Sequence, residues 1–432
     1  MSAQTAGADA SLKPVTVSER SAAPLADVTG FGDQPLERSP FAATVIDAAT
    51  IADTGARRLS DLYRLDASVS DAYNAVGYWD YASMRGFVID QTSNWRRDGL
   101  PISAETSLPL ENRERVEFLK GTSGIQAGTS APGGLVNLVI KRPTVKPLRT
   151  LRLETNHRGG LLAHADLGGR FGENRRFGYR LNLAAENIRS HASGADGSRH
   201  LLALAMDWRV SPDTVIEGEW ETSRRRQPSV PGLSLTGSTL PAPNPFININ
   251  TQPWSQANVF DNLSGSLGIQ QAINSQWRWQ AQIGTQRLKS QDRLAYPYGC
   301  FDAGTGAYYA DRYCPNGDFD LYDFRSTNER RRTHAAQIRA IGQLDTGAVR
   351  HHLSFGVLAS RFIDRGEPQA DNNSAVGTGN LFTLPVLPPD PTFGDPYTNR
   401  TERSTEIFAY DAIQWSPAFQ TWLGLRPTRL HR

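Results

Sequence analysis

Apolar and polar residues alternate one by one along the chain from about Thr150 onward. In residues 177–183 aromatic and aliphatic side chains take every second position, with Gly, Arg and Asn between them, and the pattern returns at 202–209, 216–221 and 277–283. Successive side chains of a β-strand point to opposite sides, so this period predicts strands with one apolar face and one polar face.

The connections between these strands alternate in length. Short turns are expected at 211–213, 273–276, 345–349 and 416–419, and long polar segments lie at 227–257, 294–330 and 366–403. A soluble β-sandwich also alternates its strand faces. Short and long connections that take turns in register favour a transmembrane β-barrel, whose turns gather at one rim and whose loops gather at the other.

Two further features fit a barrel between residues 146 and 432. Strands of about 11 to 15 residues are long enough for a tilted crossing of a bilayer. Four tryptophans near expected strand ends predict an aromatic girdle at the membrane interface, although an ordinary core would also use them. They are Trp208, Trp220, Trp415 and Trp422.

The segment before these strands has a different pattern of apolar and polar residues. Residues 39–145 combine short apolar strands, at 43–46 and 136–140, with helical patterns at 49–62 and 109–119. This predicts a compact domain of mixed α and β structure. Residues 1–38 are rich in Ala, Ser, Thr, Gly and Pro without a period and are expected to form an extended arm.

Composition excludes several classes of protein. Lys and Arg number 46 against 44 Asp and Glu, mixed along the chain, which gives little support for nucleic-acid binding. No apolar run reaches the roughly 18 residues of a membrane helix. The start, Met1-Ser2-Ala3-Gln4, lacks the basic residues and apolar stretch of a secretory signal.

Cysteine occurs twice, as Cys300 and Cys314 in one Gly- and Tyr-rich stretch. A disulfide between them would close a loop worth about 3 kcal/mol in the chain-entropy model and fits an oxidising compartment. Two unpaired thiols in a reducing compartment are the alternative.

Four motifs in the mixed domain resemble, in order, the plug signature of TonB-dependent siderophore receptors. They are Ser83 to Phe87 (SMRGF), Arg97 to Pro101 (RDGLP), Glu114 to Gly121 (ERVEFLKG) and Ala131 to Pro143 (APGGLVNLVIKRP). Their glycines permit tight turns, which accounts for each one singly but not for the ordered set.

This resemblance implies the fold class of a small α+β plug domain, residues 39–145, followed by an antiparallel transmembrane β-barrel, residues 146–432. It also implies the outer membrane of a Gram-negative bacterium and contact with outer-membrane lipid. The cargo would be a ferric siderophore, and transport would be driven by TonB with ExbB and ExbD. Pro14, Val15, Thr16 and Val17 resemble the TonB box, which can add as a strand to a partner's sheet.

Plug loops that face the outside would present the cargo site. The expected ligand-binding residues are Tyr78, Trp79, Tyr81, Arg85, Trp95, Ser103 and Glu105. Aromatic rings can stack on a chelate, and a guanidinium can bind its oxygens. Packing between plug and barrel is the alternative for each aromatic. Arg85 has a second interpretation, as a lock that pairs with barrel glutamates in strands beyond this chain.

The sequence offers no residues for a metal site, a cofactor site or a catalytic site. The histidines are scattered, and no cluster predicts a metal site or a cofactor. No nucleophile with a base and an orienting group predicts an enzyme, and a signalling role is not expected. Cobalamin, haem or a glycan are alternative cargoes, and a soluble all-β binding protein is the alternative of another class.

The expected strand number is about eleven, whereas barrels of this family have about 22. Edge strands left open in lipid would carry unpaired backbone groups. A truncated or split form, or a fragment without function, is therefore expected.

Overall fold

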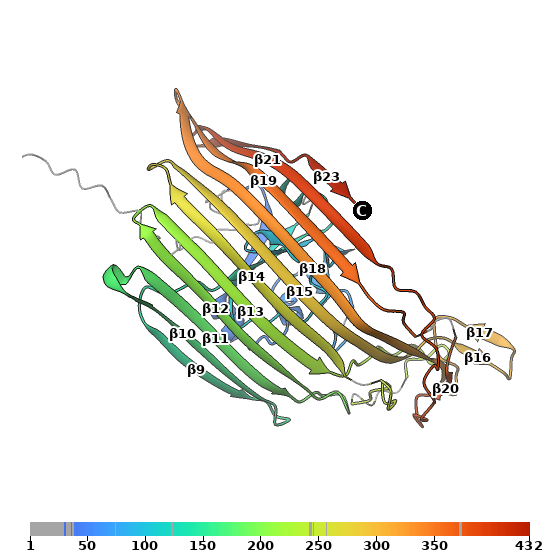
Figure 1. Ribbon diagram of the computed structural model, residues 1–432. Helices are drawn as coiled ribbons and strands as arrows, with labels where there is room; N and C mark the ends of the chain where they lie inside the picture. The colour runs from blue at the N-terminus through green and yellow to red at the C-terminus, as the bar shows by residue number, and fades with distance from the viewer. Residues whose placement is uncertain are drawn as a thin grey trace, which may run out of the picture.

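The computed structural model describes residues 39–73, 75–121, 124–241, 246–255, 257–370 and 374–432, together with Gly30, Phe31, Leu36 and Asn244. The candidate TonB box at 14–17 lies outside the described residues. The chain forms two bodies, a small mixed domain and a large curved sheet, and the small domain lies against one face of the sheet (Figure 1). We call them the plug and the wall.

Among its described residues, the plug contains two small sheets and three short helices. The first sheet has the order β1 (Ala42–Asp47), β7 (Arg113–Lys120), β8 (Gly134–Ile140), β5 (Trp95–Arg97), β6 (Leu100–Pro101). The second sheet consists of β2 (Val69–Asp71), β3 (Ala82–Met84) and β4 (Phe87–Val88). The helices are α1 (Ala48–Asp53), α2 (Ser60–Tyr63) and α3 (Gly124–Ala127). Only β5 and β8 pair in parallel among the plug pairs described.

The two strand predictions for the plug are confirmed by β1 and β8, but the helix predictions are partly wrong. One helix was expected over 49–62, whereas α1 stops before Gly55, which has φ +63° in a turn, and α2 is a separate turn. The segment 109–119 contains β7 instead of a helix. β7 pairs with both β1 and β8, and this central place in the sheet outweighs its local helical pattern.

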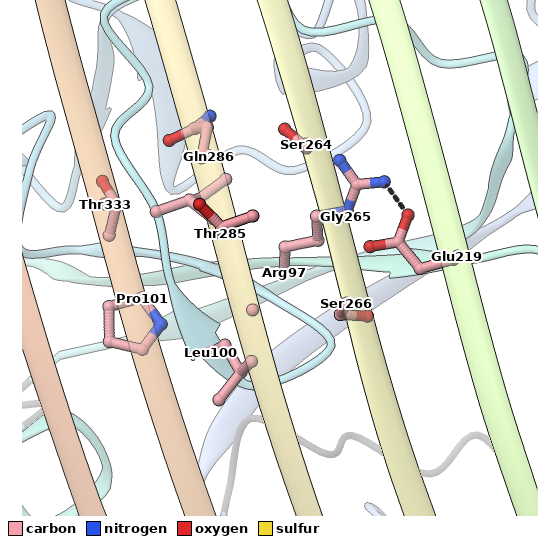
Figure 2. A pocket seen from close by; sticks show the side chains of 12 residues that line it. Arg97, Leu100, Pro101, Glu219, Ser264, Gly265, Ser266, Thr285, Gln286 and Thr333 are labelled. Atoms are coloured by element: carbon pink, nitrogen blue, oxygen red, sulfur yellow. Dashed lines mark hydrogen bonds and ion pairs between the residues drawn. The ribbon is translucent and has the colours of Figure 1, made fainter.

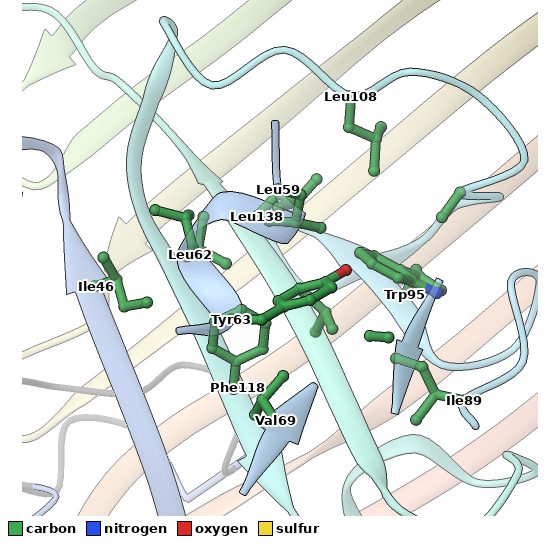
Figure 3. Close-up of a cluster of buried hydrophobic side chains, with 14 of the residues drawn as sticks. Ile46, Leu59, Leu62, Tyr63, Val69, Ile89, Trp95, Leu108, Phe118 and Leu138 are labelled. Carbon is green, nitrogen blue, oxygen red and sulfur yellow. The ribbon is translucent and has the colours of Figure 1, made fainter. Parts of the chain in front are cut away.

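The plug has a hydrophobic core of its own (Figure 3). Leu59 and Leu62 from the helical side meet Trp95, Phe118 and Leu138 from the first sheet, and all five side chains are fully buried. Every residue of this cluster belongs to the plug, so the core is built without side chains of the wall.

The wall is an antiparallel sheet whose main path has eleven strands, as expected. In chain order they are β9 (Leu148–Thr155), β10 (Leu161–Phe171), β11 (Phe177–Ile188), β12 (Gly197–Ser211), β13 (Thr214–Gln227), β14 (Asn258–Ala272), β15 (Trp277–Pro297), β18 (Asp318–Thr346), β19 (Val349–Arg365), β21 (Arg400–Ser416) and β22 (Phe419–Leu425). Two short strands join it at the side: β20 (Gly377–Asn380) pairs with β18, and β23 (Thr428–His431) pairs with β21. Within the described residues the path ends at β9 and at β22, so the sheet is open.

The connections gather at two rims, as their lengths predict. The short turns after β12, β14, β18 and β21 lie at one rim, which we call the turn rim (Figure 1). The long segments lie at the opposite loop rim, which carries the hairpin β16 (Cys300–Asp302) and β17 (Ala307–Tyr309). There Cys300 and Cys314 form a disulfide with Cα atoms 5.6 Å apart. Apolar residues of all three long loops share a cluster that includes Ile249, Tyr313 and Leu381.

The outward face of the wall is apolar in its middle. Leu267, Ile283 and Ile338 are 53%, 57% and 53% exposed there. Of the four predicted girdle tryptophans, Trp208, Trp220 and Trp415 have exposed side chains. The prediction for Trp422 is wrong, because its ring packs against Phe31 with centroids 5.0 Å apart. No helix among the described residues is long and apolar enough to cross a membrane.

Candidate functional site

Four aromatic residues of the plug, Tyr73, Tyr78, Trp79 and Tyr81, form what we call the aromatic loop. The Tyr78 hydroxyl donates a hydrogen bond to Asp292 Oδ2 of β15 at 2.6 Å. Trp79 is buried, and its ring centroid lies 5.5 Å from that of Phe260 on β14. These contacts fix one side of the loop against the wall.

The other side of the aromatic loop remains open. Tyr73 is 52% exposed, and Tyr81 is half-buried. Their ring centroids are 5.7 Å apart in an edge-to-face arrangement, and Tyr81 lies 6.3 Å from Trp79. Burial raises the pKa of the Tyr81 hydroxyl, so this group is a neutral hydrogen-bond donor at physiological pH. The loop therefore offers ring faces and hydroxyl groups to a ligand.

Arg331 of β18 gathers acidic and aromatic groups beside the loop. Its Nε lies 2.5 Å from Glu105 Oε2 of the plug, and its Nη1 lies 2.9 Å from Glu329 Oε2. The guanidinium also stands 5.7 Å from the Trp79 ring centroid. From the long loop after β19, the Tyr397 hydroxyl accepts a hydrogen bond from Arg331 Nη2 at 3.3 Å. Arg331 thus links plug, wall and loop rim.

Glu105 and Ser103 are placed by this network. Glu105 is 17% exposed, and burial raises its pKa although the Arg331 charge opposes that shift. The backbone N–H of Ser103 donates to Gln286 Oε1 at 2.9 Å, and Gln286 Nε2 donates to the Ser103 carbonyl at 3.0 Å. Ser103 is fully buried, so it positions the plug on the wall and has no surface for a ligand.

Two predicted ligand residues lie elsewhere. Trp95 is fully buried in the core of the plug, so its expected contact with a ligand is corrected to packing. Arg85 is exposed in the turn between β3 and β4, with φ +51°. Within the described residues Arg85 makes no ion pair, so it is not a lock to the glutamates of this wall.

Other residues form such a lock inside this chain. Arg97 Nη2 lies 2.5 Å from Glu219 Oε2, and Arg113 Nη1 lies 3.0 Å from Glu221 Oε2 (Figure 2 shows the first pair). All four side chains are buried. We call Arg97, Arg113, Glu219 and Glu221 the ionic lock. Burial lowers the pKa of Arg113 although Glu221 opposes the shift.

Sequence reasoning missed the ionic lock, although a signal was present. The period of two placed Glu219 and Glu221 on the polar face of their strand, and the polar face of a barrel strand points at the plug. Asp292, Arg331 and Tyr397 carried no comparable signal, because only the folded chain brings them to the aromatic loop.

Close to the lock, the plug touches the wall through a glycine. A Cβ atom on Gly284 would stand 2.7 Å from Leu100 Cδ1, so the absence of a side chain lets the β5–β6 hairpin reach the wall. The cavity beside Leu100 and Arg97 has a volume of about 20 Å³ (Figure 2). This is room for about one water molecule, so the cavity cannot hold a chelate.

Comparisons with known proteins agree with this geometry. Residues 35–135 match the family model described as the TonB-dependent Receptor Plug Domain. The metal-pseudopaline receptor CntO of Pseudomonas aeruginosa is 28% identical over 72% of this chain and 42% of its own length. The ferrichrome outer membrane transporter/phage receptor of Escherichia coli is 21% identical over 91% of this chain and 55% of its own length. The chain spans about half the length of the curated relatives it matches.

Solved structures show the same fold. The ferric-catecholate import receptor Fiu from Escherichia coli in its closed form superposes with a TM-score of 0.78, at 17% identity, over 94% of this chain and 59% of that chain. The siderophore receptor PiuA from Acinetobacter baumannii gives a TM-score of 0.76 at 17% identity, over 95% and 60%. The four proteins named above are receptors or transporters. The chain therefore has the fold of the TonB-dependent receptors, with their plug domain followed by antiparallel strands of their barrel.

Proposed function

We propose that this chain supplies the plug and a large part of the barrel wall of an outer-membrane receptor that takes up ferric siderophores. The aromatic loop carries the proposal, because it faces the loop rim with Tyr73 and Tyr81 accessible and with Trp79 and Arg331 behind them. Aromatic faces and a guanidinium suit the flat rings and anionic oxygens of such chelates.

The position of the plug supports the transport part of the proposal. The plug lies against the inner face of the wall and is fixed there by the ionic lock, so cargo passes only after the plug shifts. TonB with ExbB and ExbD would supply the force through the candidate box at 14–17. Open sheet edges are costly in lipid, so uptake also requires partners for β9 and β22.

A second candidate cargo is the chelate of another metal. The relative named a metal-pseudopaline receptor motivates it. The aromatic loop and Arg331 recognise the organic shell of a chelate and not the metal inside it, so the same residues serve both candidates.

Binding is the direct test of the site. The purified chain, folded in detergent, is titrated with ferric hydroxamate, ferric catecholate and a nickel chelate, and quenching of tryptophan fluorescence is followed. Tyr81→Ala should raise the Kd of the preferred chelate by about 5- to 10-fold, as expected for the loss of one aromatic contact. Tyr179→Ala, on the outer face of β11, is the matched control and should leave the Kd unchanged.

Uptake tests the transporter as a whole. A receptor-deleted host that expresses the chain is given labelled ferric siderophore, and the membranes are fractionated. Uptake that is lost when Val15, Thr16 and Val17 are replaced supports the proposal. A chain that is present in the outer membrane yet binds none of the chelates refutes the proposed cargo class.

A further inference from the structure

Negative charge is in excess around the aromatic loop. The Arg331 guanidinium is held by three carboxylates, which belong to Glu105 of the plug at 2.5 Å, Glu329 of β18 at 2.9 Å and Asp364 of β19 at 3.6 Å. The Arg331 side chain is 6% exposed. Water and salt screen buried charges much less than exposed ones, so the excess of negative charge acts on any ligand that enters the site.

Neighbouring side chains do not cancel this excess. Arg400 lies 3.7 Å from Asp364, but Glu402 lies 3.9 Å from the same guanidinium. Asp292 accepts a hydrogen bond from Tyr78, and among the described residues it makes no ion pair. Arg400 is therefore matched by Glu402, and Asp292 adds to the acidic character of the site.

Arg331 itself offers hydrogen bonds to a chelate but no net positive charge. Besides its contacts with carboxylates, its Nη1 donates to Ser290 Oγ at 3.0 Å and its Nη2 donates to the Tyr397 hydroxyl at 3.3 Å. An anionic chelate that approaches this guanidinium also meets the carboxylates around it, and like charges repel. The site therefore disfavours a chelate with net negative charge.

Glu105 is the most accessible of the carboxylates that hold Arg331. Its side chain is 17% exposed, whereas those of Glu329 and Asp364 are 5% and 7% exposed. Its Oε2 lies against Arg331, and within the part of the chain that the structure describes no group donates a hydrogen bond to its Oε1. One oxygen of Glu105 is thus open to a cation from outside the chain.

The aromatic loop supplies ring faces beside Glu105. Tyr73 is 52% exposed, and its ring centroid lies 5.7 Å from that of Tyr81. Burial raises the pKa of the Tyr81 hydroxyl, and the charge of Glu105 adds to this shift, so the carboxylate lies near this ring. Carboxylates and the faces of aromatic rings both attract an ammonium group. Together they are suitable partners for a protonated amine.

Trp79 offers a donor to a neutral oxygen of the same chelate. It is 5% exposed, and its indole Nε1 has no hydrogen-bond partner among the described residues. The N–H opposes the rise in the pKa of the Tyr81 hydroxyl, so it points toward the open side of the loop. Because a buried donor without an acceptor is costly, an oxygen from outside the chain stabilises it.

We propose that the aromatic loop selects ferric chelates that carry a protonated amine, and that Glu105 determines this preference. The ammonium group binds the open oxygen of Glu105 and the ring faces of Tyr73 and Tyr81, while oxygens of the chelate accept hydrogen bonds from Trp79 and Arg331. Anionic complexes such as ferric catecholates bind more weakly. The inference rests on the proposed function and narrows its cargo to cationic chelates.

The test compares three ferric chelates that share one iron-binding group and differ in charge. The probes are a linear trihydroxamate with a terminal primary amine, its N-acetyl derivative and its N-succinyl derivative, each loaded with Fe(III). Three hydroxamates neutralise Fe(III), so at pH 7 the complexes are cationic, neutral and anionic in that order. The full chain in detergent is titrated with each complex, and Kd is measured by quenching of tryptophan fluorescence.

The quantity compared is the selectivity ratio, which is the Kd of the N-acetyl complex divided by the Kd of the amine complex. In the unaltered chain it should be about 10, and the N-succinyl complex should bind more weakly than either. Glu105→Gln should lower the ratio to about 1, and Glu105→Asp, which keeps the charge, should give an intermediate ratio. The matched control is Glu114→Gln, which removes an exposed carboxylate of the plug and should leave the ratio unchanged.

A selectivity ratio of about 1 in the unaltered chain overturns the proposal. A ratio that Glu105→Gln leaves unchanged, or that Glu114→Gln lowers equally, overturns the role of Glu105. If Glu105→Gln does not fold, the order of the three Kd values in the unaltered chain and the ratio of Glu105→Asp decide.

A ferric catecholate titrated against the same samples separates this inference from the proposed function. If the anionic catecholate complex binds more tightly than the amine complex, the inference is overturned and the proposed siderophore receptor stands. A folded chain that binds none of the chelates overturns both.

Discussion

Glu111 is an acidic residue of the plug whose charge depends on one partner across the interface. Its Oε1 lies 2.6 Å from Arg199 Nη2 of β12, and its side chain is 9% exposed. Burial raises the pKa of Glu111, but the Arg199 charge and hydrogen bond outweigh it and lower the pKa to about 2. In the unfolded chain the pKa returns to its ordinary value of about 4.3. The contact therefore stabilises the fold fully above that value and is lost as the pH falls toward 2.

This gives a prediction for Glu111→Gln. At pH 7 the variant should be less stable than the unaltered chain by on the order of 3 kcal/mol, because it loses the charged contact and leaves Arg199 with Glu186 alone. The difference should shrink between about pH 5 and pH 2. Thermal unfolding in detergent across this range measures it. Glu114→Gln, at an exposed position of β7, is the control, and a difference independent of pH would show that Glu111 contributes no charge effect.

Single residues also show what the sequence could not predict about the site. Tyr78, Trp79 and Trp95 are aromatic residues of one domain, and composition does not separate them. The structure does, because Trp95 faces Phe118 and Leu138 inside the plug, whereas Trp79 faces Phe260 on a strand far away in the sequence. Burial is set by such distant partners, so the residue types of the site were predictable and their accessibility was not.

At the scale of elements, the ionic lock joins β5 and β7 of the plug to β13 of the wall. Arg113 and Glu221 are both fully buried, and the Asn112 and Asn262 side-chain amides also donate to Glu221. Removing one partner of a buried pair leaves the other charge buried without a partner, which destabilises the fold by about 3–5 kcal/mol. Arg113→Gln should therefore lower the free energy of unfolding by about that amount, as measured by denaturant titration.

Two comparisons isolate the lock. Arg85→Gln removes an arginine of the plug that makes no ion pair within the described residues, and it should change stability by at most about 0.5 kcal/mol. The double variant Arg113→Gln with Glu221→Gln should lose less than the sum of the single variants, because the two residues interact. An additive result would mean that the pair contributes no interaction of its own.

The disulfide of the loop rim gives a second prediction at this scale. Cys300 and Cys314 enclose the β16–β17 hairpin, and the loop they close is worth about 3 kcal/mol in the chain-entropy model. The variant Cys300→Ser with Cys314→Ser should speed hydrogen exchange in residues 298–317 and leave β12–β14 unchanged. Reductant added to the unaltered chain should reproduce the effect. Faster exchange throughout the wall would contradict a local role.

Elements were predictable to different degrees for a physical reason. Wall strands such as β11 and β12 have one face toward the plug and the other face outward. Polar and apolar residues therefore alternate along them, and this alternation is visible in the sequence. One face of β7 packs into the plug core through Val116 and Phe118, and the other carries Arg113 against Glu221 of the wall and Leu119 in a second apolar cluster. Seven of its eight residues are therefore at least half-buried, and the alternation disappears. That is why the sequence of β7 was taken for a helix.

At the scale of the whole molecule, plug and wall meet through buried polar pairs as well as through apolar contacts. The plug core is apolar. The interface combines an apolar cluster, which includes Leu100 of the plug and Leu358 of the wall, with polar contacts: the ionic lock, Glu111 with Arg199, and Ser103 with Gln286. Buried polar contacts stabilise only while every partner is in place. An interface of this kind holds the plug firmly in one position and loses its stability abruptly once the plug moves.

The last prediction concerns the order in which the plug and the wall unfold. In rising urea the plug should separate from the wall and unfold before the wall strands do. The interface depends on buried polar pairs that stabilise only while every partner is in place, whereas each wall strand between β10 and β21 is paired on both sides. Hydrogen exchange followed at each urea concentration should show amides of β1, β7 and β8 exposed at lower urea than those of β12–β14. In Arg113→Gln the first step should move to lower urea and the second should stay. A single transition shared by all these strands would mean that plug and wall unfold as one cooperative unit. The plug could then move during transport only if the wall opened with it.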